Sequence, residues 1–226
     1  MEKSIDNNNY YYNPNQEIKI LIVGDMATGK TSVIKRYTDD VFELTNAATI
    51  VVNFKTKIMK INGIQYNIHF WDIPGQDRNA VVTGTFARDA QGIIYCCEAN
   101  KEETRKNLKK WEEALKSKEK IDNISKIIIE NKCDMLGDKS KYNENTDNLK
   151  LTSNELGCLN FFRTSAKEGY NINDAINYLI NEIIKNIKIA DIESYNNNNN
   201  NNNNNKPNKQ LKNQNHKGNN KNKKCC

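Results

Sequence analysis

The chain is 226 residues long and carries 34 lysines and arginines against 28 acidic residues, a formal net charge of +6. That length is enough for one well-buried domain with sequence to spare. Residues 206–226 hold seven lysines and no acidic residue, so the remainder carries 6 − 7 = −1. A near-neutral body argues against a nucleic-acid-binding domain. The basic tail favours contact with anionic lipid, the alternative being that its lysines keep an asparagine-rich segment soluble.

Two further features of the composition narrow the class of protein. No run approaches the roughly 20 apolar residues of a membrane-spanning helix, and we expect no signal segment at the start. The six cysteines do not make a disulfide scaffold in a domain of this size, and Cys96 and Cys97 fall in an apolar strand. We therefore expect a protein of a reducing compartment, with any membrane contact made through an anchor.

Composition divides the chain into three parts. Residues 1–16 are rich in Asn and Tyr, and we expect them to be flexible. Residues 191–226 contain the asparagine run 196–205 and the lysine-rich end. We expect this tail to be disordered, because it buries too little apolar surface to offset the entropy of ordering it. One domain, residues 17–190, remains between the two.

The body alternates apolar strands with helical stretches. Asn62-Gly63 predicts a hairpin between two of the strands. Strands are expected at 18–23, 51–60, 64–71, 92–98 and 126–130. Helices are expected at 29–38, around Leu108, Trp111 and Leu115, and along the apolar face formed by Ile172, Ile176, Leu179, Ile183 and Ile187. This order predicts an α/β fold with a mainly parallel sheet covered on both faces, and ligands bound at the carboxyl ends of its strands.

A phosphate-binding loop follows the first strand. The segment Gly24-Asp25-Met26-Ala27-Thr28-Gly29-Lys30-Thr31 fits the pattern G-x-x-x-x-G-K-[ST], and Ser32 follows it in the helix. In such a loop the backbone N–H groups and the helix N-terminus surround phosphate oxygens. We expect Lys30 to neutralise the β and γ phosphates and Thr31 to ligate Mg²⁺. The loop specifies a nucleoside triphosphate but not its base.

The base is predicted by a second motif, Asn131-Lys132-Cys133-Asp134, at the end of a later strand. A carboxylate can accept two hydrogen bonds from the adjacent N1–H and N2–H₂ groups of guanine, whereas adenine has no such donor pair. Asp134 is therefore expected to select guanine, with Asn131 supporting the loop and the Lys132 stem packing on the ring. An enzyme that transfers phosphate from ATP is the alternative, and it leaves Asp134 unexplained.

The order of these motifs resembles the Rab proteins of the Ras superfamily over nearly all of residues 17–190. Trp71-Asp72-Ile73-Pro74-Gly75-Gln76-Asp77 resembles their WDTAGQE segment. Thr164-Ser165-Ala166-Lys167 resembles their last guanine-binding loop. Phe42 and Thr49 lie where the family places an aromatic ring near the base and a threonine on Mg²⁺ and the γ-phosphate. The resemblance implies a P-loop NTPase G domain with a six-stranded, mainly parallel sheet and helices on both faces.

The resemblance also implies how the switch works. Asp72 holds Mg²⁺ through water, the Gly75 N–H touches the γ-phosphate, and Gln76 orients the attacking water. Hydrolysis then rests on positioning and charge stabilisation, and an external activating protein is expected to assist. Loss of the γ-phosphate releases Thr49 and Gly75, and that change is the signal.

The resemblance further implies a set of partners that read and regulate the switch. Phe54, Trp71 and Phe86 match the aromatic trio that contacts effectors, although Trp71 could equally be a core residue of the sheet. Further expected partners are an exchange factor, prenylation and escort proteins, and a GDP-dissociation inhibitor. Residues 35–37, 131–134 and 161–167 look closest to members that serve lysosome-related and phagocytic compartments.

The chain stops at Cys225-Cys226, directly after two lysines. Many Rab proteins receive two geranylgeranyl groups on such a pair. Two lipid chains bind a membrane stably where one binds marginally, and lysines add attraction to the cytoplasmic leaflet. We therefore expect a lipid-anchored protein on the cytoplasmic face of an intracellular or plasma membrane, with a cytosolic pool.

Departures from the Rab pattern concentrate around the γ-phosphate. Met26 stands where the family has a small residue, and Pro74 stands in place of an alanine. Val51, Asn53 and the segment 77–79 also differ from the family pattern. These departures leave two interpretations of function. The first is a GTP-hydrolysing switch of membrane traffic with slow turnover, and the second is a constitutively GTP-bound docking module with negligible hydrolysis.

Overall fold

A computed structural model describes residues 16–44, 48–76, 80–143 and 146–204. Six strands form one sheet in the order β2-β3-β1-β4-β5-β6, and of these only β2 runs antiparallel to its neighbour. The strands are β1 (Glu17–Val23), β2 (Asn53–Ile61), β3 (Ile64–Asp72), β4 (Gly92–Glu98), β5 (Ser125–Asn131) and β6 (Asn160–Arg163). The six-stranded, mainly parallel sheet expected for a P-loop G domain is confirmed.

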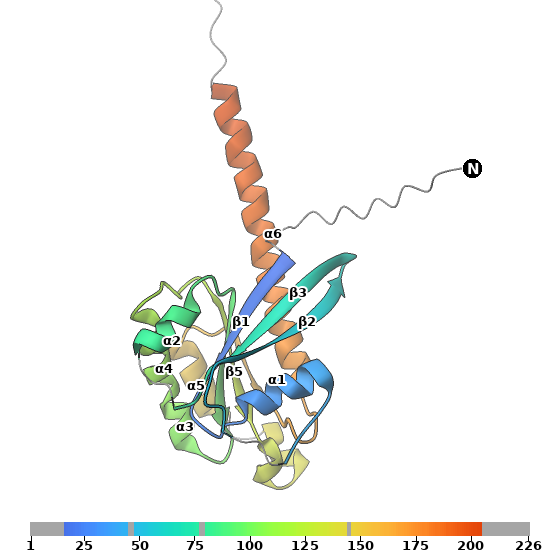
Figure 1. Cartoon of the computed structure of the whole chain (residues 1–226), viewed down its shortest axis with the longest axis vertical. Helices are drawn as coiled ribbons and strands as arrows, with labels where there is room; N and C mark the ends of the chain where they lie inside the picture. The colour runs from blue at the N-terminus through green and yellow to red at the C-terminus, as the bar shows by residue number, and fades with distance from the viewer. Residues whose placement is uncertain (1–15, 45–47, 77–79, 144–145, 205–226) are drawn as a thin grey trace, which may run out of the picture. The chain divides into compact units, whose positions relative to one another are not determined.

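Helices cover both faces of the sheet (Figure 1). One face packs against α1 (Lys30–Asp39) and α6 (Ile172–Asn204), through a cluster that includes Ile20, Phe70 and Leu179. The other packs against α2 (Ala80–Ala87), α4 (Leu108–Lys116) and α5 (Asp147–Glu155), through a cluster around Trp111. The remaining helical elements are α3 (Glu102–Lys106) and the 3₁₀ turns η2 (Cys133–Leu136) and η3 (Lys139–Asn143).

The strands β4 and β5 are buried along their whole length, which explains why they read as continuous apolar runs. The hairpin between β2 and β3 turns at Asn62 and Gly63, whose φ angles are +51° and +84°. Positive φ at both positions is the geometry that Asn-Gly favours. Strand β2 begins at Asn53, two residues later than expected, because Val51 lies in a bend with 74% of its surface exposed.

A buried polar group joins α4 to the sheet. The Glu112 carboxylate accepts hydrogen bonds from the Tyr95 hydroxyl and from Lys126 Nζ, the latter at 3.2 Å, and all three side chains are buried. A buried charge is costly unless it is paired and hydrogen-bonded. This cluster therefore holds one orientation of α4 against β4 and β5.

The first of two compact units of the chain ends at Ile187, three residues before the expected domain boundary. Helix α6 continues to Asn204 and so includes nine of the ten residues of the asparagine run, whereas composition predicts disorder from residue 191. Extending an existing helix adds one hydrogen bond per residue fixed, whereas starting one is costly, and asparagine is only a mildly unfavourable helix residue. The expected disorder of residues 205–226 stays a prediction, since they lie outside the described residues.

Within the described ranges, none of the helices combines the length and the apolar character needed to cross a bilayer.

Candidate functional site

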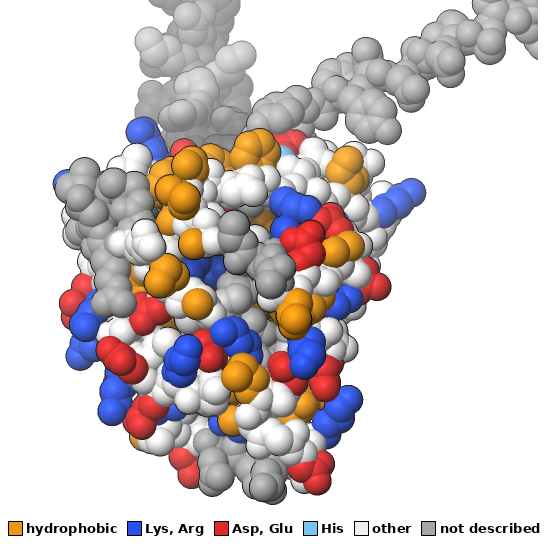
Figure 2. Space-filling view, turned by 60° about the horizontal axis from the view of Figure 1, so that its bottom comes forward, with side chains coloured by type: hydrophobic (Ala, Val, Ile, Leu, Met, Phe, Trp, Pro, Cys, Tyr) orange, Lys and Arg blue, Asp and Glu red, His pale blue; other side chains and the backbone are white. Residues whose placement is uncertain are grey.

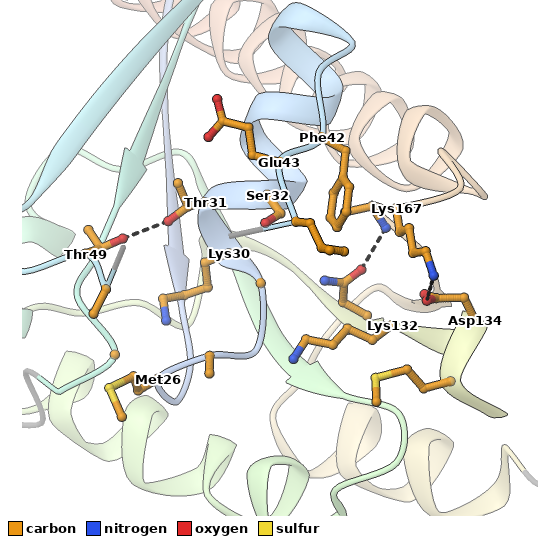
Figure 3. Close-up of a pocket in the computed structure, with 18 residues that line it drawn as sticks. Met26, Lys30, Thr31, Ser32, Phe42, Glu43, Thr49, Lys132, Asp134 and Lys167 are labelled. Atoms are coloured by element: carbon orange, nitrogen blue, oxygen red, sulfur yellow. Dashed lines mark hydrogen bonds and ion pairs between the residues drawn. The ribbon is translucent and has the colours of Figure 1, made fainter. Parts of the chain in front are cut away.

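A cavity of about 590 Å³ opens at the end of the sheet where the parallel strands terminate, the end that Figure 2 turns toward the viewer. On that face acidic, basic and apolar side chains are interspersed. Figure 3 shows the cavity with Met26 and Lys30 at one end and Asp134 and Lys167 at the other. Predicted binding residues that line it are Met26, Ala27, Gly29, Lys30, Thr31, Ser32, Phe42, Thr49, Gly75, Asn131, Lys132, Asp134, Ala166 and Lys167.

The phosphate loop is held against β4 and β5 by glycines. A Cβ added to Gly24 would lie 2.0 Å from the carbonyl oxygen of Cys96, and one added to Gly29 would lie 2.4 Å from Nδ2 of Asn131. Both glycines also have positive φ, at +146° and +91°. No other residue fits at either position without displacing the neighbouring strand or loop.

Lys30 lies almost fully buried in the centre of this loop. Its Nζ donates hydrogen bonds of 2.9 Å to the backbone carbonyls of Gly24 and Asp25. Burial lowers the pKa of Lys30 from its usual range, and interactions with the Cys96 thiol and with the carboxylates of Asp72 and Asp25 counter part of that shift. The loop therefore presents a desolvated cation, which an anionic ligand would stabilise in its charged form.

Three side chains from three different segments meet beside Lys30. The Thr31 hydroxyl lies 2.8 Å from the Thr49 hydroxyl and donates to Oδ2 of Asp72 at 2.5 Å. The other carboxylate oxygen, Oδ1, is buried without a hydrogen-bond partner. Burial raises the pKa of Asp72, against the hydrogen bond from Thr31 and the charge of Lys30. An orphaned carboxylate oxygen beside two hydroxyls is the kind of oxygen donor set that suits Mg²⁺ and its waters.

At the opposite end, Asn131 links the phosphate loop to the loop after β6. Its Nδ2 donates to the Thr28 carbonyl at 3.0 Å, and its Oδ1 accepts from the Ala166 N–H at 3.1 Å. Asp134 is oriented by Ser165, whose hydroxyl donates to Oδ1 at 2.6 Å. Its Oδ2 lies 3.9 Å from the Lys167 ammonium. The two predicted base-binding segments are thus held together by direct side-chain contacts.

Phe42 and Lys132 form the walls between these two ends. Phe42 is partly buried against the core cluster that contains α1 and α6. The Lys132 stem lines the cavity, while its ammonium pairs with the buried Glu98 carboxylate at 2.9 Å. An aromatic ring and an aliphatic stem are suited to the two faces of a planar base.

Asp25 occupies a different place from the one its motif position suggests. Its carboxylate does not line the cavity but accepts hydrogen bonds from Asn107 Nδ2 at 2.7 Å and Trp111 Nε1 at 3.0 Å. The side chain therefore ties the phosphate loop to the start of α4. Gly24, Thr28, Asp72 and Ser165 likewise stand behind the cavity wall rather than in it.

Gly75 and Gln76 pack against the phosphate loop at Met26. A Cβ on Gly75 would lie 2.3 Å from the backbone nitrogen of Met26, so the two loops touch through their backbones. The Gln76 side chain is exposed, and its Nε2 donates to the Met26 sulfur at 3.2 Å. Met26, which departs from the Rab pattern, is thus in direct contact with Gln76, the predicted catalytic residue.

Four cavity residues were not among those that we expected from the sequence: Glu43, Leu44, Ala48 and Met135. All four are sequence neighbours of predicted ones, and they carry no motif of their own. Glu43 pairs with Lys35 at 2.6 Å, which fixes the segment after Phe42 to α1. Cys225 and Cys226 lie outside the described residues.

Comparison with known proteins decides the family. The model of the Ras family matches residues 19–185. The chain belongs to the Ras family. It is 32% identical to the Ras-related protein Rab-13 of Mesocricetus auratus over 166 residues, which cover 74% of this chain and 79% of the relative. It is also 32% identical to RabG2 of Dictyostelium discoideum and to Rab-7L1 of Homo sapiens, over 168 and 172 residues, in each case 74% of this chain and 83% of the relative.

Similarity to these relatives identifies the chain as a Rab-type small GTPase of the Ras superfamily. It is an enzyme that hydrolyses GTP to GDP and acts as a switch in vesicle traffic. The three aromatic residues expected on the effector surface of this GTPase lie together. Trp71 stacks on Phe54 with ring centroids 6.0 Å apart and lies 6.1 Å from Phe86. Lys19 Nζ lies 4.6 Å from the Trp71 ring and donates to the Arg88 carbonyl at 2.7 Å. This lysine holds the aromatic group next to the end of α2.

The bond from Trp111 to Asp25 leads to a testable prediction. In the GTPase, Trp111→Phe removes one donor from a buried carboxylate, and we expect the free energy of unfolding to fall by about 1–3 kcal/mol. Urea unfolding of the nucleotide-loaded protein measures the change. In an Asp25→Ala background the same substitution should cost clearly less, because no acceptor remains. Equal losses in the two backgrounds would show that the hydrogen bond contributes nothing beyond ring packing.

Proposed function

We propose that this Rab-type GTPase binds GTP in the cavity between the phosphate loop and the loop after β6. The proposal rests on one observation, that a single cavity joins the buried Lys30 to the oriented carboxylate of Asp134. Lys30 and the loop N–H groups bind the phosphates, and Phe42 and the Lys132 stem enclose the base. Asp134 accepts from guanine N1–H and N2–H₂, and the Ala166 N–H, which also donates to Asn131 Oδ1, meets O6. Ala27, Gly29, Ser32, Asn131 and Lys167 complete the lining of the site, and Gly24, Asp25, Thr28 and Ser165 support it from behind.

Mg²⁺ fits the group formed by Thr31, Thr49 and Asp72. The two hydroxyls would ligate the ion directly, and the unpartnered Oδ1 of Asp72 supports a bond to one of its waters. When bound, Mg²⁺ would supply positive charge beside the phosphates, which would stabilise the charge that develops during hydrolysis. Loss of the γ-phosphate removes the contacts of Thr49 and of the Gly75 N–H, so both segments relax.

Hydrolysis depends on Gln76, whose amide orients the attacking water. Its contact with Met26 supports slow turnover, because the amide is engaged by sulfur and the methionine side chain lies at the phosphate end of the cavity. Pro74 adds to this effect by fixing φ in a segment that must move. The same contact favours a second candidate function, a GTP-bound docking module with negligible hydrolysis.

Effectors are expected at the aromatic surface, and a membrane is expected at the C-terminal cysteines. Effectors bind beside the switch segments at Phe54, Trp71 and Phe86, where Phe54 is 62% exposed. An exchange factor, a GTPase-activating protein and a GDP-dissociation inhibitor regulate the cycle. Prenyl groups on Cys225 and Cys226, with the lysines that precede them, hold the protein at the cytoplasmic face of a membrane.

The nucleotide bound to the purified protein tests the proposal. We expect guanine nucleotide to co-purify and bound GTP to convert to GDP slowly in Mg²⁺, with ATP failing to compete. Chromatography of the released nucleotide over time identifies the bound nucleotide and measures the conversion of GTP to GDP. Persistent GTP favours the docking module over the switch, and binding of ATP in place of guanine nucleotide contradicts the proposed site.

Substitutions of Met26 test the origin of slow turnover. Met26→Gly removes both bulk and sulfur, and we expect single-turnover hydrolysis to accelerate by about tenfold or more, equivalent to roughly 1.4 kcal/mol of barrier. Met26→Leu keeps the volume and removes the sulfur. A leucine variant as slow as the wild type assigns the obstruction to bulk, whereas a fast one assigns it to the hydrogen bond. If the glycine variant and the wild type hydrolyse equally fast, Met26 does not obstruct.

The two terminal cysteines provide a test of the anchor. With a geranylgeranyl donor and cytosolic extract, we expect two lipids on the wild type and one on Cys226→Ser. The double variant Cys225→Ser/Cys226→Ser should carry none, and its membrane binding should be lost. Cys158→Ser, in the folded domain, is the control and should be modified like the wild type. Mass spectrometry counts the lipids, and any lipid on the double variant argues against this anchor.

A further inference from the structure

The contact between Met26 and Gln76 places a thioether directly on the proposed catalytic amide. Nε2 of Gln76 donates to Sδ of Met26 at 3.2 Å, and 53% of the Met26 surface is exposed to solvent. Figure 3 shows the Met26 side chain at the end of the cavity where Lys30 lies. The side chain is therefore about half open to solvent, it lies close to the phosphate subsite, and its sulfur accepts a hydrogen bond from the residue proposed to orient water.

The backbone around this sulfur has little freedom to move away. Gly75 packs so closely on Met26 that a Cβ there would lie 2.5 Å from the Met26 Cα and 2.6 Å from the carbonyl carbon of Asp25. Asp25 is in turn held by Trp111 and Asn107. A chemical change at the Met26 sulfur must consequently be accommodated by the Gln76 side chain rather than by a shift of the phosphate loop.

We propose that Met26 is an oxidation site through which a peroxide slows GTP hydrolysis by this protein. The proposal rests on the role assigned to Gln76 in the proposed function. In the reaction a lone pair of the thioether attacks one peroxide oxygen, the O–O bond breaks, and an S–O bond forms. The thioether is oxidised to the sulfoxide and hydrogen peroxide is reduced to water. Methionine sulfoxide reductases reverse such a change.

Sulfoxidation alters the hydrogen bond to Gln76 in a defined direction. A thioether sulfur is a weak acceptor, whereas a sulfoxide oxygen is strongly polar and reaches further from the chain. The oxidised side chain would hold the Gln76 amide more firmly and keep it from the attacking water. Strengthening one hydrogen bond by its usual net contribution corresponds to hydrolysis about fivefold slower.

The other described methionines differ from Met26 in ways that make them useful comparisons. Met135 is exposed to a similar extent, at 55%, but lies at the guanine end of the cavity beside Asp134. Met59 is half-buried, and its sulfur accepts a bond from the Tyr37 hydroxyl. Met135 will be oxidised along with Met26, but its sulfur accepts from Asn100 Nδ2 at 4.0 Å, at the end of the cavity away from the phosphate loop.

The cysteines of the folded domain compete poorly for peroxide. Burial raises the pKa of Cys96 to about 11 and those of Cys133 and Cys158 to about 12. Peroxide reacts with the thiolate, which is scarce at neutral pH for such groups. The thioether, which does not need to ionise, stays reactive.

The test compares each protein with itself before and after oxidation. Full-length wild type, Met26→Leu and Met135→Leu are treated with hydrogen peroxide, loaded with GTP and followed through a single turnover in Mg²⁺. Peptide mass spectrometry maps the added oxygen. We expect hydrolysis to slow about fivefold in the wild type and in Met135→Leu, no slowing in Met26→Leu, and recovery after treatment with methionine sulfoxide reductase.

Three results would overturn the proposal. They are equal slowing in Met26→Leu and the wild type, an unchanged rate in protein whose Met26 is fully oxidised, and the absence of oxygen on Met26 under conditions that oxidise Met135. Failure of the proposed function looks different, because it appears in untreated protein as absent guanine nucleotide or absent turnover. GTP loading of the untreated sample of each protein measures the first of these.

Discussion

Close packing at three glycines is the constraint on which the rest of the site depends. Gly24 lies against the carbonyl of Cys96, Gly29 against the side chain of Asn131, and Gly75 against the backbone of Met26. Each contact leaves no room for a Cβ, so three loops from separate parts of the sequence meet at one place. The buried hydrogen bonds of Asn131 then fix their spacing. The cavity is the space that these loops leave between them, and its shape follows from the absence of three side chains.

The buried charged residues around the cavity are arranged so that a bound ligand would neutralise them. Lys30 and Asp72 are both buried, and burial shifts their pKa values in opposite directions, each toward the neutral form. A polyanion beside Lys30 and a divalent cation beside Asp72 would reverse both shifts together. On the proposed function, the same residues would therefore bind the nucleotide and oppose its departure.

The sequence predicted the fold and most of the cavity, because both depend on short motifs with fixed geometry. The strand before Gly24, the hairpin at Asn62 and the segments around Lys30 and Asp134 were all readable in this way. The directions of individual side chains could not be predicted from these motifs. The Asp25 carboxylate binds Trp111 rather than facing the cavity, and Gln76 contacts the Met26 sulfur. Both depend on long-range packing that no local pattern encodes. The helix that continues to Asn204 likewise reflects extension from a packed segment, which composition alone does not reveal.

The exposure of Met26 has an evolutionary consequence. Its side chain lies at the open edge of the phosphate loop and does not belong to either core cluster. Substitutions there leave the core intact, in contrast to those at Gly24, Gly29 or Gly75, where any added side chain displaces a neighbour. Selection could thus adjust how long the protein stays in one state by changing a single codon, with little penalty in folding. On the proposed function, a substitution at position 26 would change the lifetime of the signal while leaving the folded core intact.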